Sequence, residues 1–158
     1  MNPRIQSYII QFSQLFDGAP WLDETFSKKL DGLTDAEAFV PSPGNNHSVA
    51  EVVSHVIEWR NEIIRRLSED SAERRLTEDI GNNWMPLDQL QQIGWQQLYA
   101  DLKESQQRLI SLLESKDDNF LDEPLADTEF NKEYFVAGIL HHDVYHLGQI
   151  GLILKWVK

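Results

Sequence analysis

The fold is decided by the C-terminal stretch NKEYFVAGILHHDVYHLGQIGLILKW, which runs from Asn131 to Trp156. We predict a helix over this range, because its apolar residues recur at helical spacing and the alternation of a strand is absent. At about 100° per residue, His142 and His146 lie about 40° apart. They share a side of the helix with the apolar residues Phe135, Ile139, Ile150 and Ile153. Both imidazoles are therefore expected to point into the protein.

Three further segments are predicted to be helices, because stretches rich in Pro, Gly and Asn separate them. They cover residues 3–16 with a continuation over 21–30, residues 48–67, and residues 87–115. Ser48 is a good N-cap, and Glu51 three residues later completes a capping box. Gly94 is a weak point in the third of these helices. The connections are expected to be loops over residues 40–46, 68–85 and 117–130.

Four helices of about 20 residues or more predict an all-α fold, and long connections between them fit a four-helix bundle. The chain has 158 residues, which is close to the usual size of one domain. We therefore expect a single domain over residues 1–158. The connections leave room for either an up-down-up-down or a crossover topology.

The composition is that of a globular protein, with 41% apolar and 25% charged residues. No run of about 18 apolar residues occurs, so no membrane-spanning helix and no membrane partner are expected. The N-terminal sequence MNPRIQ lacks the apolar segment and cleavage site of a signal peptide, which makes a cytoplasmic location the expectation. The sequence has no cysteine, and this excludes disulfides, zinc–thiolate sites and a cysteine nucleophile.

The charge balance is strongly acidic, with 26 Asp and Glu against 14 Lys and Arg and a net charge of −12. Because phosphate backbones are bound mainly by Lys and Arg, we expect no nucleic acid partner. Arg65-Arg66 and Arg74-Arg75 form a local basic cluster, but acidic residues surround it. We interpret that cluster as a solvated helix end.

A third histidine, His55, lies at the border of the buried stripe of the helix over residues 48–67, where the rim of a pocket is expected. Two inward imidazoles, His142 and His146, need partners for their lone pairs, since buried polar groups are costly without one. A divalent cation provides such a partner. Ordinary hydrogen bonds to neighbouring residues are the alternative, and the His-x-x-x-His spacing alone does not decide between the two.

The remaining candidates are assigned to structural roles. His141 points about 100° away from the histidine pair and is excluded as a ligand, and His47 is expected at the surface. Asp143 is expected to be buried and hydrogen-bonded in a structural role. For Tyr145 a packing or dimer role is favoured over proton donation.

Two carboxylates and four aromatic side chains are further candidates for supporting roles. Glu51 and Glu62 lie at the right distance to orient His55, although solvated surface positions fit them equally well. The aromatic residues are core residues by default and can otherwise line a pocket: Trp59, Trp84, Trp95 and Phe135.

The run LHHDVYHLGQI, from Leu140 to Ile150, resembles the C-terminal motif His-Asp-x-Tyr-His-x-Gly-Gln-Ile of the DinB-like superfamily. A second match combines Pro43-Gly44 with the stretch from His47 to Arg60. It resembles the family's proline-glycine loop, serine cap, and helix with one metal-binding histidine followed by a tryptophan. The segment from Phe120 to Leu125 is similar to close relatives as well.

The resemblance implies a four-helix bundle of up-down-down-up topology with a three-histidine metal site. Carried over by position, the ligands are His55, His142 and His146. Zinc or nickel is the first choice for the single divalent ion, and iron, copper and manganese are further candidates. The resemblance also implies a homodimer, and some relatives are transferases or isomerases that use a low-molecular-weight thiol.

Three neutral imidazoles leave an open position on the ion, which is typical of a catalytic site. The first hypothesis is therefore a metal-dependent enzyme of thiol S-transferase or hydrolase type, acting on a small-molecule substrate such as a low-molecular-weight thiol. A non-catalytic metal-binding or stress-associated bundle protein is the second. A structural dimer module without metal is the third.

Overall fold

The computed structural model describes residues 2–44, 47–76 and 83–157. Within them, the chain forms four long helices, α1 (Pro3–Phe16), α4 (Val49–Glu69), α6 (Trp95–Glu114) and α8 (Lys132–Val157), and no β-strand. The predicted all-α fold is confirmed. Residues 45–46 and 77–82, which belong to two of the predicted loops, lie outside the described residues.

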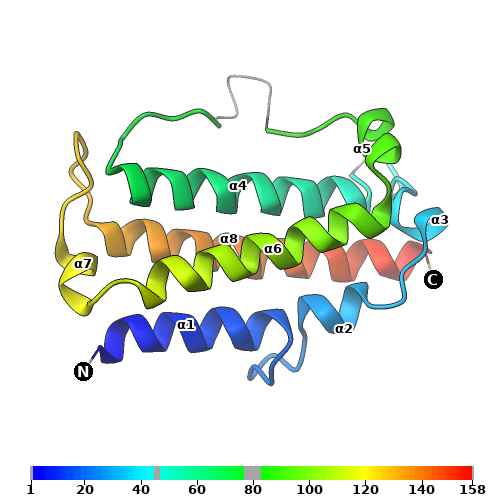
Figure 1. The fold of residues 1–158 in the computed structure, drawn as a ribbon. Coiled ribbons are helices and arrows are strands. Elements are labelled where there is room, and N and C mark those ends of the chain that lie inside the picture. The colour runs from blue at the N-terminus through cyan, green and yellow to red at the C-terminus, as the bar shows by residue number, and fades with distance from the viewer. Residues whose placement is uncertain (1, 45–46, 77–82, 158) are drawn as a thin grey trace.

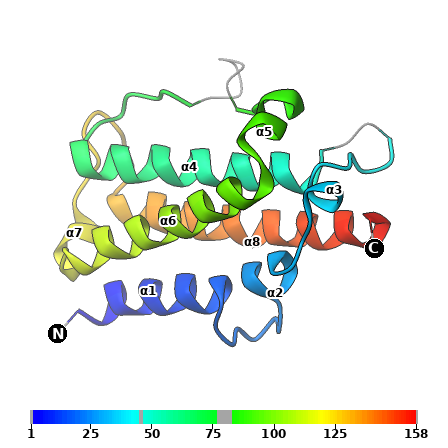
Figure 2. The same cartoon turned by 45° about the vertical axis from the view of Figure 1, so that its right-hand side comes forward.

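The four long helices pack as a bundle (Figures 1 and 2). Helix α4 contacts α6 and α8, and α1 contacts the same two helices from the other side. In the ribbon, α1 and α8 run in one direction, whereas α4 and α6 run in the opposite direction. The helices that carry the three candidate ligands, α4 and α8, are therefore antiparallel neighbours.

Four short helices complete the fold and refine the predicted boundaries. They are α2 (Phe26–Leu30), α3 (Asp35–Ala38), α5 (Leu87–Ile93) and α7 (Asp118–Asp122). The predicted continuation over residues 21–30 is helical only in its second half. Gly94 divides the predicted helix over 87–115, because its φ of +85° is not a helical conformation. A Thr34–Glu37 capping box starts α3, which the sequence analysis had not assigned.

The predicted capping box of α4 is confirmed. The Glu51 amide donates to Ser48 Oγ over 3.2 Å, and the Ser48 amide donates to Glu51 Oε2 over 2.7 Å. Two otherwise unpaired donors of the first turn are thereby satisfied. This cap sets where α4 begins, and thus where His55 lies along the bundle.

An ion pair is buried at the centre of the bundle. Arg60 of α4 donates from Nε to Asp143 Oδ2 of α8 over 2.9 Å, and its Nη2 lies 2.8 Å from the same oxygen. Arg60 Nη1 also donates to Ser105 Oγ of α6 over 3.2 Å. Asp143 is buried and hydrogen-bonded, as predicted. One buried polar cluster thus joins three helices.

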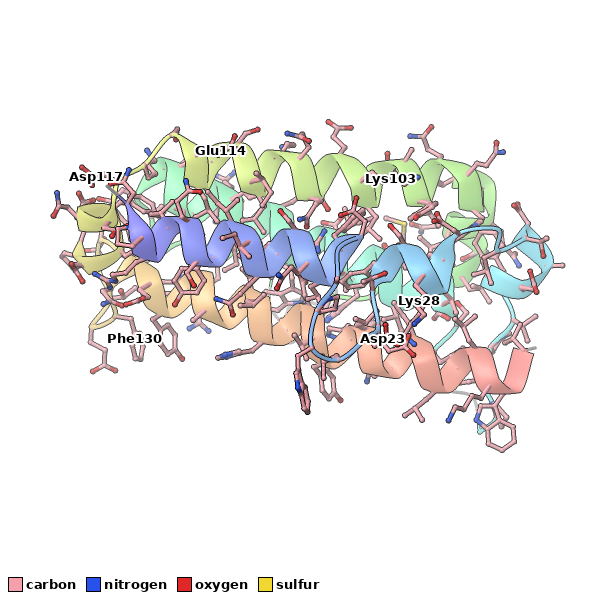
Figure 3. All side chains as sticks on the ribbon, turned by 90° about the horizontal axis from the view of Figure 1, so that it is seen from below. Asp23, Lys28, Lys103, Glu114, Asp117 and Phe130 are labelled. Atoms are coloured by element: carbon pink, nitrogen blue, oxygen red, sulfur yellow. The ribbon has the colours of Figure 1, made fainter. Side chains whose placement is uncertain are left out.

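Lys28 and Lys103 are among the charged side chains on the outside of the bundle (Figure 3). Lys28 forms an exposed ion pair with Asp23 at 3.4 Å, an interaction of small energetic value in solvent. Among the described helices, none has the length and the apolar character that crossing a membrane requires.

Candidate metal centre

Three imidazoles from α4 and α8 meet inside the bundle. The Nε2 atoms of His55 and His142 are 3.1 Å apart. The ring centroid of His146 lies 4.6 Å from that of His55 and 4.2 Å from that of His142. One nitrogen from each ring can be chosen so that the three atoms lie within 4.8 Å of one another. The structure thus brings together all three residues that the sequence analysis named as ligands.

The outward-facing nitrogens of two of these rings have oxygen partners. His55 Nδ1 lies 2.9 Å from the carbonyl oxygen of Asn83, and His146 Nδ1 lies 2.6 Å from Oε1 of Gln149. Since these oxygens only accept hydrogen bonds, each Nδ1 must carry the proton. The lone pair of each ring is then on Nε2, and His55 Nε2 lies 3.1 Å from His142 Nε2. Histidines that bind metals usually have such a partner on the other nitrogen.

The third ring has a buried nitrogen without a partner. Among the described residues, neither His142 Nδ1 nor Asp143 Oδ1 has a hydrogen bond, and the two atoms are 3.8 Å apart. If His142 donates Nε2–H to His55, its Nδ1 carries no proton and both atoms stay unpaired. If Nε2 binds a cation, the proton moves to Nδ1 and faces the carboxylate of Asp143. The residues present therefore fit a divalent metal ion.

Two of the histidines are held in the neutral form that binds metals. Burial lowers the pKa of His55 to about 4, and burial likewise lowers the pKa of His146 to about 4. Both side chains are almost inaccessible, with 5% and 4% of their surface exposed. At neutral pH their Nε2 lone pairs are free for coordination.

Aromatic rings cover the cluster on the α4 side. Trp84 is stacked between His47 and His55, with ring centroids 3.6 Å and 4.0 Å away. Trp59 Nε1 donates to Asn83 Oδ1 over 2.8 Å, which positions the residue that holds His55. His47, which we expected to be a surface residue, is half-buried at the edge of the site and lies 3.3 Å from Glu51.

Several residues considered in the sequence analysis have other roles. His141 is exposed and lies outside the cluster. Glu51 serves the cap of α4, and Glu62 bonds Arg65 over 3.1 Å and 3.2 Å, so neither carboxylate orients His55. Trp95 is a core residue with 3% exposure.

The residues that do orient the ligands were not identified from the sequence. Gln149 lies three residues after His146 on the same helix, so its spacing was a usable signal. Asn83 acts through its backbone carbonyl from a connection 28 residues after His55. A backbone oxygen in a loop leaves no sequence pattern.

Two cavities adjoin the cluster. One has a volume of about 650 Å³ and is lined by His142 together with Trp59 and Phe135. The other, of about 450 Å³, is lined by His47 and Gln149. A small molecule in either cavity would lie beside a candidate ligand or a residue that contacts one.

The chain is similar in structure to one solved protein that was crystallised with double-stranded DNA. The colibactin self-resistance protein ClbS, in a crystal structure of its complex with a double-stranded DNA, matches with a TM-score of 0.66. The identity is 19%, and the match covers 96% of this chain and 94% of that one. The likeness shows the shared fold.

This finding corrects the expectation that nucleic acid is excluded as a partner. A protein with this fold is found in complex with DNA, so the exclusion was wrong. The exclusion was based on the net charge of −12, which is a sum over the whole chain. Binding depends on the local arrangement of charges, which a net charge does not describe.

Comparison with known families agrees with the motifs around the histidines. No protein among those with curated descriptions matches the chain. The DinB superfamily matches over residues 22–150, a range that includes α4, α6 and most of α8 with all three histidines. The chain belongs to the DinB superfamily.

Proposed function

We propose that His55, His142 and His146 hold one divalent metal ion and that the protein is a metal-dependent enzyme of hydrolase or thiol S-transferase type. The observation that carries this proposal is the convergence of three imidazole nitrogens within 4.8 Å. Nitrogen ligands suit zinc and nickel, which are the ions we expect first.

An open site favours an enzyme over a purely structural centre. Within the described part of the chain, the cluster offers three imidazole ligands, and neither a carboxylate nor a fourth imidazole joins them. Three protein ligands with an open position are typical of catalytic zinc sites. When bound, the ion supplies Lewis-acid chemistry by lowering the pKa of a water or thiol ligand. The cavity of about 650 Å³ beside His142 gives a substrate room to approach.

The protein's own side chains arrange this site. Asn83 and Gln149 hold two of the rings in the tautomer that presents Nε2. Asp143, charge-paired with Arg60, gives the third ring a carboxylate to face. Since the sequence contains no cysteine, any thiol in the reaction must come from a co-substrate.

Elemental analysis of the purified protein tests metal binding directly. We expect about one zinc or nickel ion per chain, lost in His55→Ala, His142→Ala and His146→Ala. The matched control is His141→Ala, which removes the adjacent, exposed imidazole and should keep the ion. Equal metal content in His141→Ala and His142→Ala would overturn the assignment.

Turnover assays test the enzymatic part. Zinc- and nickel-loaded protein should convert at least one ester, amide or thiol-conjugation substrate, and chelator should abolish the activity. The alternative is a non-catalytic metal-binding or stress-associated protein, which the deep burial of His55 and His146 favours. Bound metal together with no turnover in any of these assays would favour that alternative.

Double-stranded DNA is a second candidate ligand, favoured by the ClbS complex. In a chain with a net charge of −12, phosphate contacts must come from local basic groups, and the exposed Arg74 is the one we test. Such binding weakens steeply with salt. Fluorescence anisotropy with a labelled duplex at about 50 and 200 mM salt, with Arg74→Gln as the variant, tests it.

A further inference from the structure

The cavity beside His142 carries positive charge in an acidic protein. It is lined by residues of α4 and α8 and by Arg74 and Leu76 of the chain that follows α4. Arg66 and Arg74 both line it, and no carboxylate is among its lining residues in the described chain. The protein as a whole has a net charge of −12. The charge of this cavity is thus opposite to that of the molecule.

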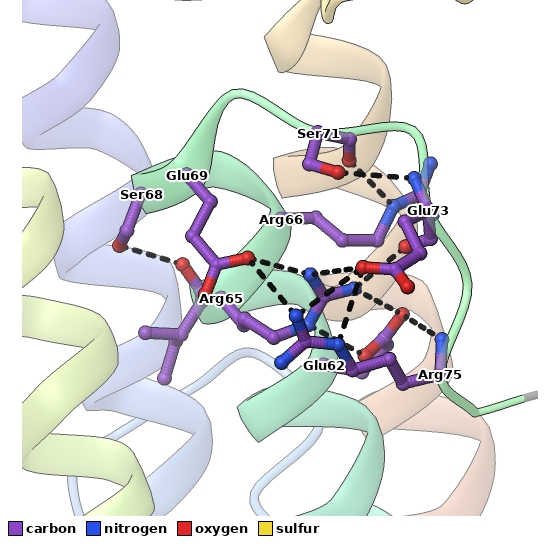
Figure 4. Close-up of polar contacts among 9 residues, drawn as sticks. Glu62, Arg65, Arg66, Ser68, Glu69, Ser71, Glu73 and Arg75 are labelled. Carbon is purple, nitrogen blue, oxygen red and sulfur yellow. Dashed lines mark hydrogen bonds and ion pairs between the residues drawn. The ribbon is translucent and has the colours of Figure 1, made fainter.

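The neighbouring arginines differ from Arg66 because carboxylates neutralise them, as Figure 4 shows. Arg65 contacts Glu62 at 3.1 Å and Glu69 at 2.8 Å. Arg75 lies 3.2 Å from Glu73. Within the basic cluster that we interpreted as a solvated helix end, Arg65 and Arg75 are therefore in ion pairs, whereas Arg66 and Arg74 line the cavity.

Arg66 is the buried member of this cluster. It is only 5% exposed, and its guanidinium lies over the ring of Phe135, 4.6 Å from the centroid. Within the described chain, its one side-chain hydrogen bond runs from Nε to the carbonyl oxygen of Ser71 over 3.3 Å. The two terminal nitrogens have no carboxylate within ion-pair distance there. A buried guanidinium whose terminal nitrogens have no such carboxylate is suited to hold an anionic ligand.

Two like charges in one cavity reinforce this conclusion. Burial lowers the pKa of Arg66, the Glu62 carboxylate offsets part of this effect, and the positive charges of Arg74 and Arg65 lower the pKa further. An anion bound between the two side chains would offset both the burial of the Arg66 charge and its repulsion by Arg74. Arginine suits this role because its planar fork can donate two parallel hydrogen bonds to a carboxylate, sulfonate or phosphate.

The rest of the cavity is apolar and aromatic. Trp59, Ile63, Leu76 and Phe135 contribute to its wall. Its volume of about 650 Å³ is in the range of sites that bury a small organic molecule. His142 lies at the wall shared with the metal centre.

We propose that this cavity binds small molecules with an aromatic or apolar body and an anionic group, which is held by Arg66 and Arg74. The body packs between Trp59 and Phe135, and a second functional group reaches His142. This inference deepens the proposed function, because it defines the substrate class of that site. The anion-binding part depends on the two arginines and not on the metal.

Displacement of the fluorescent probe 8-anilinonaphthalene-1-sulfonate tests the proposal. The competitors are 1-naphthoate, 1-naphthyl phosphate and the neutral 1-naphthol, which share one ring system and differ in the charged group. We expect the anions to compete roughly tenfold or more better than 1-naphthol. The two anions also show whether a carboxylate or a phosphate is preferred.

Variants connect the preference to the two arginines. Arg66→Met and Arg74→Gln should each reduce the anion preference, and Arg66→Lys should retain part of it by keeping the charge. Arg74 is exposed, so its variant is expected to fold even if Arg66→Met does not. The matched control is Arg108→Gln, which removes the same charge from an exposed position on α6.

Chelator separates this proposal from the metal site. The anion preference should persist in chelator-treated protein and in His146→Ala, because His146 does not line the cavity. Loss of the preference on metal removal would assign anion binding to the ion and overturn the role of the arginines. Equal affinity for 1-naphthol and the anions, or an equal effect of Arg108→Gln, would overturn it too. If the purified protein binds no metal but keeps the anion preference, the proposed metal-dependent function is wrong and the anion-binding cavity stands.

Discussion

Arg60 of α4 and Asp143 of α8 form an ion pair that is 1% and 0% exposed, with Arg60 Nη2 2.8 Å from Asp143 Oδ2. Asp143 directly follows the candidate ligand His142, and Arg60 lies on the same helix as His55. Any sliding of α4 along α8 would separate these two charges in a medium of low polarity. The pair therefore fixes the register in which His55 meets His142.

Removing one member of this pair should strongly destabilise the protein. Arg60→Met leaves the Asp143 carboxylate buried without its counter-charge, at a cost of about 3–5 kcal/mol. Urea unfolding measures the effect. The double variant Arg60→Met/Asp143→Leu should recover most of the loss, because both charges are gone. A single variant no less stable than Arg108→Gln would show that the pair does not fix the two helices.

Metal loading should stabilise the folded protein. A ligand present at about 1,000 times its Kd adds about 4 kcal/mol to the free energy of unfolding. We expect the Tm of zinc-loaded protein to fall on treatment with chelator and to recover on addition of zinc. His146→Ala should show no response to either, whereas His141→Ala should respond like the parent protein. A Tm independent of zinc in the parent protein would contradict the metal site.

The stability of the metal-free protein should fall as the pH falls from about 6.5 to about 4. Burial lowers the pKa of His55 and of His146 to about 4 from 6.5, so in this window the unfolded chain binds protons that the folded protein does not. Each imidazole changes the free energy of unfolding by at most about 1.4 kcal/mol per pH unit. Its stabilising contribution is fully present above pH 6.5 and is lost as the pH falls towards 4. Urea unfolding at several pH values measures the slope.

The control for this pH dependence is the double variant His55→Ala/His146→Ala. It should show a flatter dependence in the same window, since neither imidazole is left to take up a proton on unfolding. His141→Ala removes an exposed imidazole and should keep the slope of the parent protein. An unchanged slope in the double variant would mean that other groups cause the pH dependence.

Loss of the Gln149 side chain should weaken metal binding without abolishing it. Gln149 Oε1 holds Nδ1 of His146 at 2.6 Å, and partners of this kind affect metal affinity by about 10–100-fold. Competition of Gln149→Ala with a chromophoric chelator for zinc measures the change. Tyr145→Phe is the matched control, because it removes only the other hydrogen bond of Gln149, from Nε2 to Tyr145 Oη. Equal zinc affinity in Gln149→Ala and the parent protein would argue against this role.

The features that could be predicted from the sequence are local ones. The capping box of Ser48 and Glu51 and the inward direction of His142 and His146 follow from the spacing of residues within a single helix. At Gly94 the sequence predicts only a weak point in the helix, because a glycine in a helix does not by itself reveal a positive φ. Family resemblance, rather than spacing, added His55 to the ligands.

Helical periodicity alone determined that this chain forms long amphipathic helices with two imidazoles on a buried face, since that pattern depends only on the rotation per residue. The tertiary structure decided the rest: the approach of His55, the carbonyl of Asn83 on its ring, and the pairing of Arg60 with Asp143. It also buried Arg66 while the preceding residue, Arg65, is in an ion pair with Glu62. These contacts join residues that are far apart in the chain. They depend on the conformations of the loops between the helices, which the spacing of residues within a helix does not determine.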